Sequence, residues 1–327
     1  MNYSLLSNHR SKLMAIAMIW IACFHASFWL DNKLLSFIKS NGFGGVDIFV
    51  FLFGFGVYYS LTKNKNISVF KFYRNRLLRL LPYVIPVLVV YCIYNSYDIY
   101  TSILYVLLLD FWKSGNTTLW YFPAMIAFII ISPIVFYSLE KDLKNTFVYS
   151  IIICIIAFVF YKDTTQMIFG SRLPIFIMGF VYGKASMEQK LIKIKDIVLH
   201  VIFLFIGLYL LYYNYHHFGS YMWSHGLYWY PFILIAPSLC FILSIIFNVI
   251  DKISALNLIC KILNNLGKIT LEFYLFHELM IKIIDNLVFI PGDYYGIIRN
   301  TATAIITLVI AYTYHTTIKH YINKFKN

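Results

Sequence analysis

Long runs of apolar residues alternate with short polar segments along the whole chain. A transmembrane helix needs about 20 apolar residues, and fewer when the flanking side chains snorkel to the surface. By this measure ten runs are predicted to cross a bilayer, at residues 13–30, 44–61, 77–95, 119–139, 146–161, 171–186, 197–214, 228–250, 269–289 and 301–318. The pattern therefore predicts an all-α, polytopic membrane helix bundle.

The segment DIYTSILYVLLLDFW, residues 98–112, is apolar but short. A full crossing there would invert every later loop. We expect an interfacial or re-entrant helix on the outer side instead.

Composition supports a membrane protein, since 61% of the 327 residues are hydrophobic and only 13% are charged. Soluble domains are nearer half apolar and one quarter charged. The apolar excess runs from end to end, so we expect a single membrane domain over residues 1–327 with no appended soluble domain.

The net charge of +13 follows the positive-inside rule, which makes nucleic-acid binding an unnecessary explanation. With the N-terminus inside, 20 of the 27 basic residues fall in inner segments. Both termini are therefore predicted to be cytoplasmic.

No metal or redox site is expected. The five cysteines are scattered without a C-x-x-C pair, and we interpret them as small buried hydrophobes. His216, His217 and His225 share an outer loop but lack a reliable metal spacing.

The first apolar run carries a histidine, His25, about 20 Å along the helix from Lys12 at 1.5 Å per residue. Intramembrane ionisable groups usually face the bundle interior and often mark function. His25 is either a hydrogen-bonded structural group or a reactive one.

Asp47 opens the second run, within NGFGGVDIFVFLFGFG, at a depth that His25 could match. A carboxylate beside an imidazole would fix its tautomer and raise its basicity. The alternative is a carboxylate that faces the positive end of its own helix. The glycines of this segment, Gly44, Gly45, Gly54 and Gly56, permit close helix approach.

Basic residues precede the third run in FKFYRNRLLRLLPYVIP. Arg76 and Arg79 share a helix face, with Arg74 and Lys71 nearby. Arginine forks suit the phosphates of a cytosolic donor. Anchoring of the helix or contact with anionic lipid would also explain the charge.

Three further regions hold polar or aromatic candidates. Glu272 and His277 lie in the ninth run, five residues apart, so they do not share a helix face closely, and Glu278 is expected to point elsewhere. Trp120 and Tyr121 fit either a substrate contact or an aromatic belt. Arg172 could hold an anionic or sugar acceptor, or snorkel to the surface.

Six motifs occur in the order and spacing of the acyltransferase-3 family, which the chain resembles over nearly its whole length. They are IACFH, GFGGVDIFVFLFGF, FYRNRLLRLLPY, LWYFPAMIAF, RLPIFIMGFVYG and LGKITLEFYLFH. The resemblance implies a ten-helix bundle in the bacterial cytoplasmic membrane.

The resemblance also implies an activity, an O-acyltransferase that takes an acyl group, most often acetyl, from cytosolic acyl-CoA. The acceptor would be a hydroxyl of a surface polysaccharide or a lipid-linked sugar. Acetyl-CoA would be a donor substrate, with no permanently bound cofactor. His25 would be catalytic, helped by Asp47 or Glu272, and Arg76 and Arg79 would hold the CoA.

The remaining candidates complete the expected site. We assign Arg74 and Lys12 to the donor side, and Trp120, Tyr121, Arg172 and His277 to the acceptor. The chain departs from the family pattern at Met14, where members usually carry a basic residue eleven positions before the histidine. Lys12 and Arg10 are the nearest basic residues.

A transporter or flippase of a polysaccharide intermediate is the alternative function. Intramembrane His, Asp and Glu would then serve transport. Such proteins often contain two related halves with broken helices, and the chain shows no convincing internal repeat.

Overall fold

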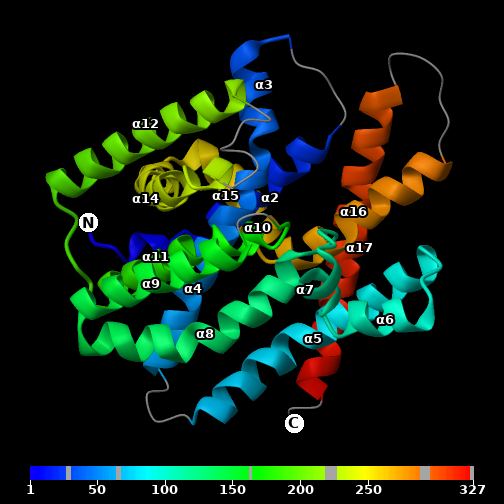
Figure 1. The fold of residues 1–327 in the computed structure, drawn as a ribbon. Coiled ribbons are helices and arrows are strands. Elements are labelled where there is room, and N and C mark those ends of the chain that lie inside the picture. The colour runs from blue at the N-terminus through cyan, green and yellow to red at the C-terminus, as the bar shows by residue number, and fades with distance from the viewer. Residues whose placement is uncertain (27–30, 64–67, 162–163, 218–226, 288–294, 325–327) are drawn as a thin grey trace.

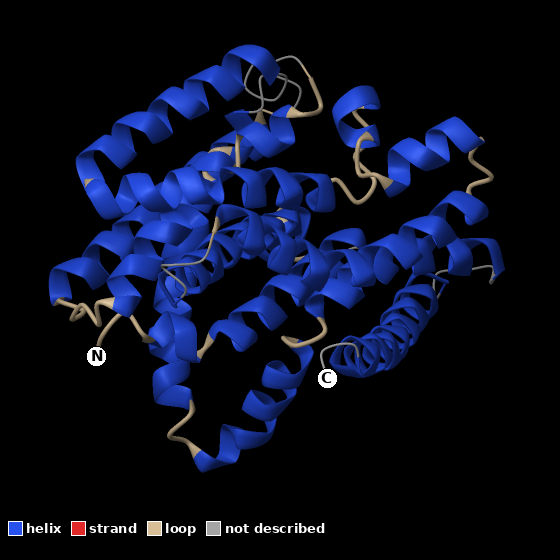
Figure 2. Cartoon of the chain, turned by 90° about the horizontal axis from the view of Figure 1, so that it is seen from below, coloured by secondary structure: helices blue, strands red, loops and turns tan. Residues whose placement is uncertain are grey.

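The computed structural model describes residues 1–26, 31–63, 68–161, 164–217, 227–287 and 295–324. Over these ranges the chain is helical and contains no strand (Figure 2). The all-α prediction is therefore confirmed for this part of the chain.

Each of the ten predicted segments falls on a helix (Figure 1). In chain order these are α2 (Arg10–His25), α4 (Gly45–Lys63), α5 (Val69–Tyr94), α8 (Tyr121–Lys141), α9 (Leu143–Tyr161), α11 (Leu173–Met187), α12 (Ile194–His216), α14 (Phe232–Ile250), α16 (Thr270–Leu287) and α17 (Tyr295–Lys324). The predicted ends at 27–30 and 288–289 lie outside the described residues.

Five of these helices are long and apolar enough to cross a membrane, among the residues that the structure describes. They are α4 with the short helix η1 (Gly42–Gly44), α5, α8, α12 and α14. The structure therefore supports a membrane protein, while the count of ten spans stays a prediction.

Segment 98–112 is not one helix. It divides into α6 (Ile99–Val106) and α7 (Asp110–Ser114), with Leu108 between them at a φ of 61°. The Asp98 carboxylate caps the start of α6 by accepting the Thr101 amide at 3.0 Å. Helices of eight and five residues are too short to cross, as the sequence predicts.

The remaining short helices are connectors: α1 (Leu5–Asn8), α3 (Lys33–Ser40), α10 (Met167–Gly170), η2 (Leu227–Trp229), η3 (Ser254–Leu256) and α15 (Asn257–Leu266). Of these, α15 packs against α2 and follows α14 in the chain. It places the beginning of α2 next to the loop after α14.

The centre of the bundle is α4, which packs against α2, α11 and α8. A Cβ on Gly54 would clash with the Phe176 carbonyl, and a Cβ on Gly179 would clash with the Phe51 carbonyl. The two backbones therefore touch, as the glycine pattern of the second run predicts for Gly54. Large aromatic side chains fill the surrounding core.

The outer helices present apolar side chains to the surroundings. On α12, Phe205 and Tyr209 are 69% and 68% exposed. Figure 1 shows α12 and α14 at one side of the molecule and α16 and α17 at the other. Exposed apolar faces on this scale suit contact with lipid rather than water.

Candidate active site

His25 is the last residue of α2, and its ring lies against the ring of His277 from α16. The ring centroids are 5.6 Å apart and the rings cross at 65°. His277 is 7% exposed, and neither of its ring nitrogens has a hydrogen-bond partner among the described residues. A buried imidazole without a partner is uncommon and is often explained by catalysis or by an unseen ligand.

The two histidines border a cavity of about 550 Å³, which we call the aromatic cavity. It lies among α2, η1, η2, α16 and the start of α11. Its polar lining also includes Arg172, Glu278, Thr117 and Thr118. Seven phenylalanine, tyrosine and tryptophan rings contribute to its wall: Phe24, Phe43, Trp120, Tyr215, Tyr228, Trp229 and Tyr274. Aromatic faces with a few convergent polar groups are typical of small-molecule sites.

Arg172 is held at the wall of the aromatic cavity by Asp47. Its Nε lies 3.0 Å from Asp47 Oδ1, and its Nη2 donates to Asp47 Oδ2 at 3.2 Å. Both side chains are at most 1% exposed. Trp120 and Trp229 present their rings to the guanidinium, with centroids 5.5 and 5.1 Å away.

The ion pair corrects the expectation that Asp47 lies beside His25. Close packing of α4 on α11 brings the first turn of α4 to the start of α11, where Arg172 is the N-cap residue. The Asp47 carboxylate therefore pairs with Arg172 and not with His25. His277 occupies the place beside His25 that the sequence analysis gave to a carboxylate.

Glu272 is also directed away from His25. Its Oε1 lies 2.7 Å from Nδ1 of His315 on α17. His277, five residues later on α16, faces α2 instead, as the helical offset predicts. The structure thus places Glu272 in a separate hydrogen bond with His315. Glu278 borders the aromatic cavity, contrary to the expectation that it points elsewhere.

A second, smaller cavity of about 200 Å³ lies toward the beginning of α2, and we call it the arginine cavity. Arg10, Met14 and Tyr121 border it. Tyr121 therefore faces this cavity and not the aromatic one. Arg10 and His25 are about 22 Å apart along α2 at 1.5 Å per residue, so the two cavities lie near opposite ends of this helix.

Two arginines converge on the backbone of α4 beside the arginine cavity. Arg10 Nη2 donates to the Leu52 carbonyl at 3.3 Å, and Arg76 Nη2 donates to the Gly56 carbonyl at 3.2 Å. Arg76 lies within electrostatic reach of Arg10 and Arg79. Arg74 and Arg79 are exposed.

Lys12 does not join this group. Its ammonium is buried, forms an ion pair with Asp251 and lies 5.3 Å from the Phe247 ring centroid. Burial alone would raise the pKa of Asp251, but the hydrogen bond and charge of Lys12 hold that pKa below its usual value. Arg10, one turn before Met14, is the basic residue that reaches the cavity.

Tyr274 lies between the two ends of the site, because it borders both the arginine cavity and the aromatic cavity. Its ring lies 5.7 Å from that of Tyr121. The sequence analysis missed Tyr274, although the residue stands three positions before His277 and therefore on the same helix face.

The described residues contain no group of three or more His, Cys, Asp or Glu side chains that could hold a metal ion. His216 and His217 pack on the rings of Tyr212 and Tyr213. His225 lies outside the described residues.

Comparison with known proteins yields one finding. The family model described as an acyltransferase domain, acyltransferase 3, matches residues 13–316. No curated protein and no solved structure matches the chain. Because the match covers nearly the whole sequence, the chain belongs to the acyltransferase-3 family of membrane acyltransferases.

Proposed function

We propose that this protein is an O-acyltransferase of the cytoplasmic membrane. It would transfer an acetyl or similar acyl group from cytosolic acyl-CoA to a hydroxyl of a surface polysaccharide or a lipid-linked sugar. Family membership supports acyl transfer. The observation that carries the rest is the His25–His277 pair at the aromatic cavity, which shares the lining residue Tyr274 with the arginine cavity.

The arginine cavity is the donor end of this proposal. The guanidinium groups of Arg10 and Arg76 both donate to carbonyl groups of α4, and the exposed Arg79 lies near enough to Arg76 to repel its charge. Like charges repel, so such a cluster is best stabilised by an anion with several negative charges. The phosphates of CoA supply these charges, and planar guanidinium forks bind them well.

Arg10 would take the role that the family pattern gives to a basic residue at the position of Met14. Both residues border the same cavity, one helical turn apart. The long side chain of Arg10 lets its guanidinium reach Leu52 from that lower turn. Lys12 is already paired with Asp251 and is a structural residue in this account.

The aromatic cavity is the acceptor end. Sugar rings present apolar faces and a rim of hydroxyls, which match aromatic walls interrupted by polar groups. Arg172 is fixed by Asp47 and also donates from Nη1 to the Ile168 carbonyl at 3.2 Å and to the Ser171 hydroxyl at 3.0 Å. The second N–H of Nη2 is the donor that would bind the acceptor, and these contacts hold it in one orientation. Glu278, Thr117 and Thr118 add hydrogen-bonding groups at the same wall.

His25 would act as the general base between these two ends. It takes the proton from the acceptor hydroxyl as that oxygen attacks the thioester carbonyl. The carbon–sulfur bond then breaks, CoA leaves as a thiolate, and the protonated His25 returns the proton to the sulfur. A transient acyl group on His25 is the alternative route to the same products.

Transfer by the purified protein tests this proposal. The protein is reconstituted in liposomes with acyl-labelled acetyl-CoA and an oligosaccharide acceptor, and acyl ester on the sugar is measured by mass spectrometry. We expect ester formation together with saturable acyl-CoA binding. A flippase without acyl chemistry would show neither, and that result would overturn the proposal.

A further inference from the structure

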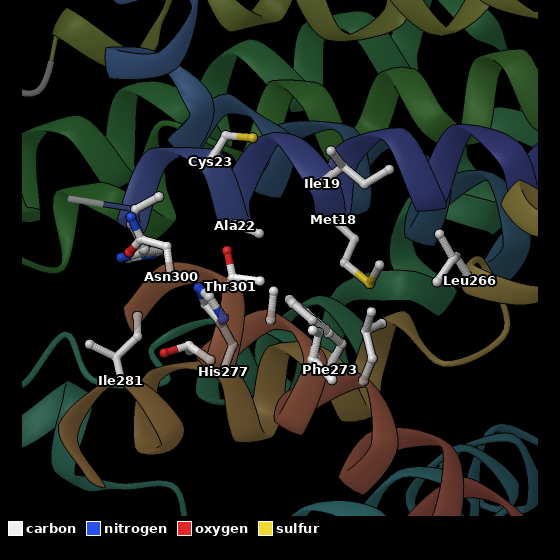
Figure 3. Close-up of a pocket in the computed structure, with 16 residues that line it drawn as sticks. Met18, Ile19, Ala22, Cys23, Leu266, Phe273, His277, Ile281, Asn300 and Thr301 are labelled. Atoms are coloured by element: carbon white, nitrogen blue, oxygen red, sulfur yellow. The ribbon is translucent and has the colours of Figure 1, made fainter. Parts of the chain in front are cut away.

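The histidine pair also borders a third cavity, of about 450 Å³, which has no role in the scheme above and which we call the apolar cavity. It lies between α2 on one side and α16 and α17 on the other (Figure 3). In Figure 3, Met18 and Ala22 stand across from Phe273 and His277. Most of the remaining lining is aliphatic.

Polar groups are few in the apolar cavity. They are the imidazoles of His25 and His277, the Cys23 thiol, the Asn300 amide and the hydroxyls of Thr301 and Thr303. The Thr303 hydroxyl is buried and has no hydrogen-bond partner among the described residues. Buried polar groups normally find a partner. Together with the unpartnered nitrogens of His277, this hydroxyl indicates a ligand with a polar atom beside an otherwise apolar body.

The apolar cavity opens toward the hydrocarbon of the membrane. Ile19 of α2 and Ile305 of α17 are part of its lining, and they are 41% and 56% exposed. On helices of a membrane bundle such side chains contact lipid tails. A hydrocarbon chain could enter here without crossing water, whereas a sugar or a phosphate would lose its hydration and find few polar side chains to replace it.

We propose that the apolar cavity binds a hydrocarbon chain covalently attached to one of the two reactants, with the polar end of that chain at His25 and His277. This inference rests on the proposed function, and it adds that one of the two substrates carries a hydrocarbon chain. The chain is either the lipid tail of the acceptor or an acyl group longer than acetyl on the donor. Each buried methylene should improve affinity roughly fourfold.

Filling the cavity tests the proposal. Ala304 lines the apolar cavity from α17, and Ala302, two residues earlier on the same helix, is not part of its lining. We would measure transfer by wild type, Ala304→Phe and Ala302→Phe with acetyl-CoA or octanoyl-CoA. The acceptor is either a soluble oligosaccharide or the same sugar on a polyprenyl lipid.

Ala304→Phe should lower kcat/KM at least tenfold for the reactant that carries the chain. Acetyl transfer to the soluble sugar should stay within twofold of wild type, and Ala302→Phe should change no combination by more than twofold. A selective loss with octanoyl-CoA identifies the donor chain, and a selective loss with the lipid-linked sugar identifies the acceptor tail. An equal loss in all combinations, or none, would overturn the proposal.

A binding experiment separates this inference from the proposed function. A fatty acid carrying a diazirine is photolysed with the purified protein, and the labelled peptides are identified by mass spectrometry. We expect labelling of α2 and α17 around the cavity in wild type, and at least a fivefold loss in Ala304→Phe or in the milder Ala22→Leu on the opposite wall. Labelling that is insensitive to both variants contradicts a hydrocarbon site, whether or not acyl transfer occurs.

Discussion

Arg172 and Asp47 show how a partner decides the role of a charged residue in this bundle. Each side chain alone would be a charge inside a membrane protein, which is costly. Together they form a buried ion pair at 3.0 Å that also fixes the wall of the aromatic cavity. Removing one partner leaves the other as an uncompensated buried charge, whereas removing both leaves no buried charge behind.

Asp47→Ala should therefore destabilise the protein by about 3–5 kcal/mol. The double variant Asp47→Ala/Arg172→Leu should recover much of that stability but lose transfer to the acceptor, because the guanidinium is gone. Thermal unfolding in detergent and a transfer assay measure the two effects. A double variant less stable than Asp47→Ala would contradict the assignment.

Arg10 and Lys12 are two residues apart in the chain but have different roles. Arg10 reaches the arginine cavity, and Lys12 pairs with Asp251. Arg10→Met should raise the KM for acyl-CoA at least tenfold, because a hydrogen bond to a charged group contributes about 1.5–3 kcal/mol. Stability should not fall much, since one of three repelling charges is removed.

Lys12→Met is the matched control. Asp251 is 38% exposed and stays hydrated after the loss of its partner, so we expect a KM within twofold of wild type and a stability cost of about 1 kcal/mol or less. Steady-state kinetics with varied acyl-CoA measure both variants. The assignment fails if Lys12→Met impairs donor binding and Arg10→Met does not.

Residue contacts of this kind were the least predictable part of the site. The sequence singled out His25, Arg76 and Arg172 because charged groups inside apolar runs need partners, and the structure places His25 and Arg172 at the aromatic cavity and Arg76 against α4. Their partners lie on helices distant in the chain, and hydropathy contains no information on helix rotation or neighbours. Asp47 was therefore placed beside His25 when it pairs with Arg172.

At the scale of elements, the helices themselves followed from the apolar runs. Segment 98–112 was recognised as too short, and its break at Leu108 follows from a backbone conformation that the apolar pattern does not reveal. The glycines of α4 predicted close packing against another helix, but they did not indicate that this helix is α11.

Gly54→Ala should destabilise the protein by about 1–3 kcal/mol, because the new methyl group meets the rigid Phe176 backbone. Gly56→Ala on the same helix is the comparison. Its Cβ would lie 2.9 Å from Nη2 of Arg10, a flexible group that can move. Thermal unfolding should rank Gly54→Ala as the more damaging, and equal or reversed costs would contradict the close backbone contact.

At the scale of the whole molecule, the charge bias predicts that successive loops lie on alternate sides of the membrane. Single cysteines are introduced at Lys113 and Lys141, both exposed, in a variant without the five native cysteines. An impermeant maleimide applied to intact cells should label Lys113→Cys, and Lys141→Cys only after permeabilisation. The opposite pattern would invert the predicted topology.

The order of the cavities along α2 also belongs to this scale. The sequence analysis assigned Lys12, near the start of α2, to the donor side and His25, at its end, to catalysis, whereas the structure places Arg10 and not Lys12 at the arginine cavity. The apolar cavity was not foreseen, because it lies between α2, α16 and α17, and the apolar runs do not reveal how these helices pack.

Substitution of His25 tests the central claim most directly. Acyl transfer and acyl-CoA binding are measured on the same purified preparations of wild type, His25→Ala and His320→Ala, the last being an exposed histidine of α17. We predict that His25→Ala lowers transfer by at least about a hundredfold while the Kd for acyl-CoA stays within twofold, and that His320→Ala changes neither. Transfer by His25→Ala at close to the wild-type rate would contradict the account.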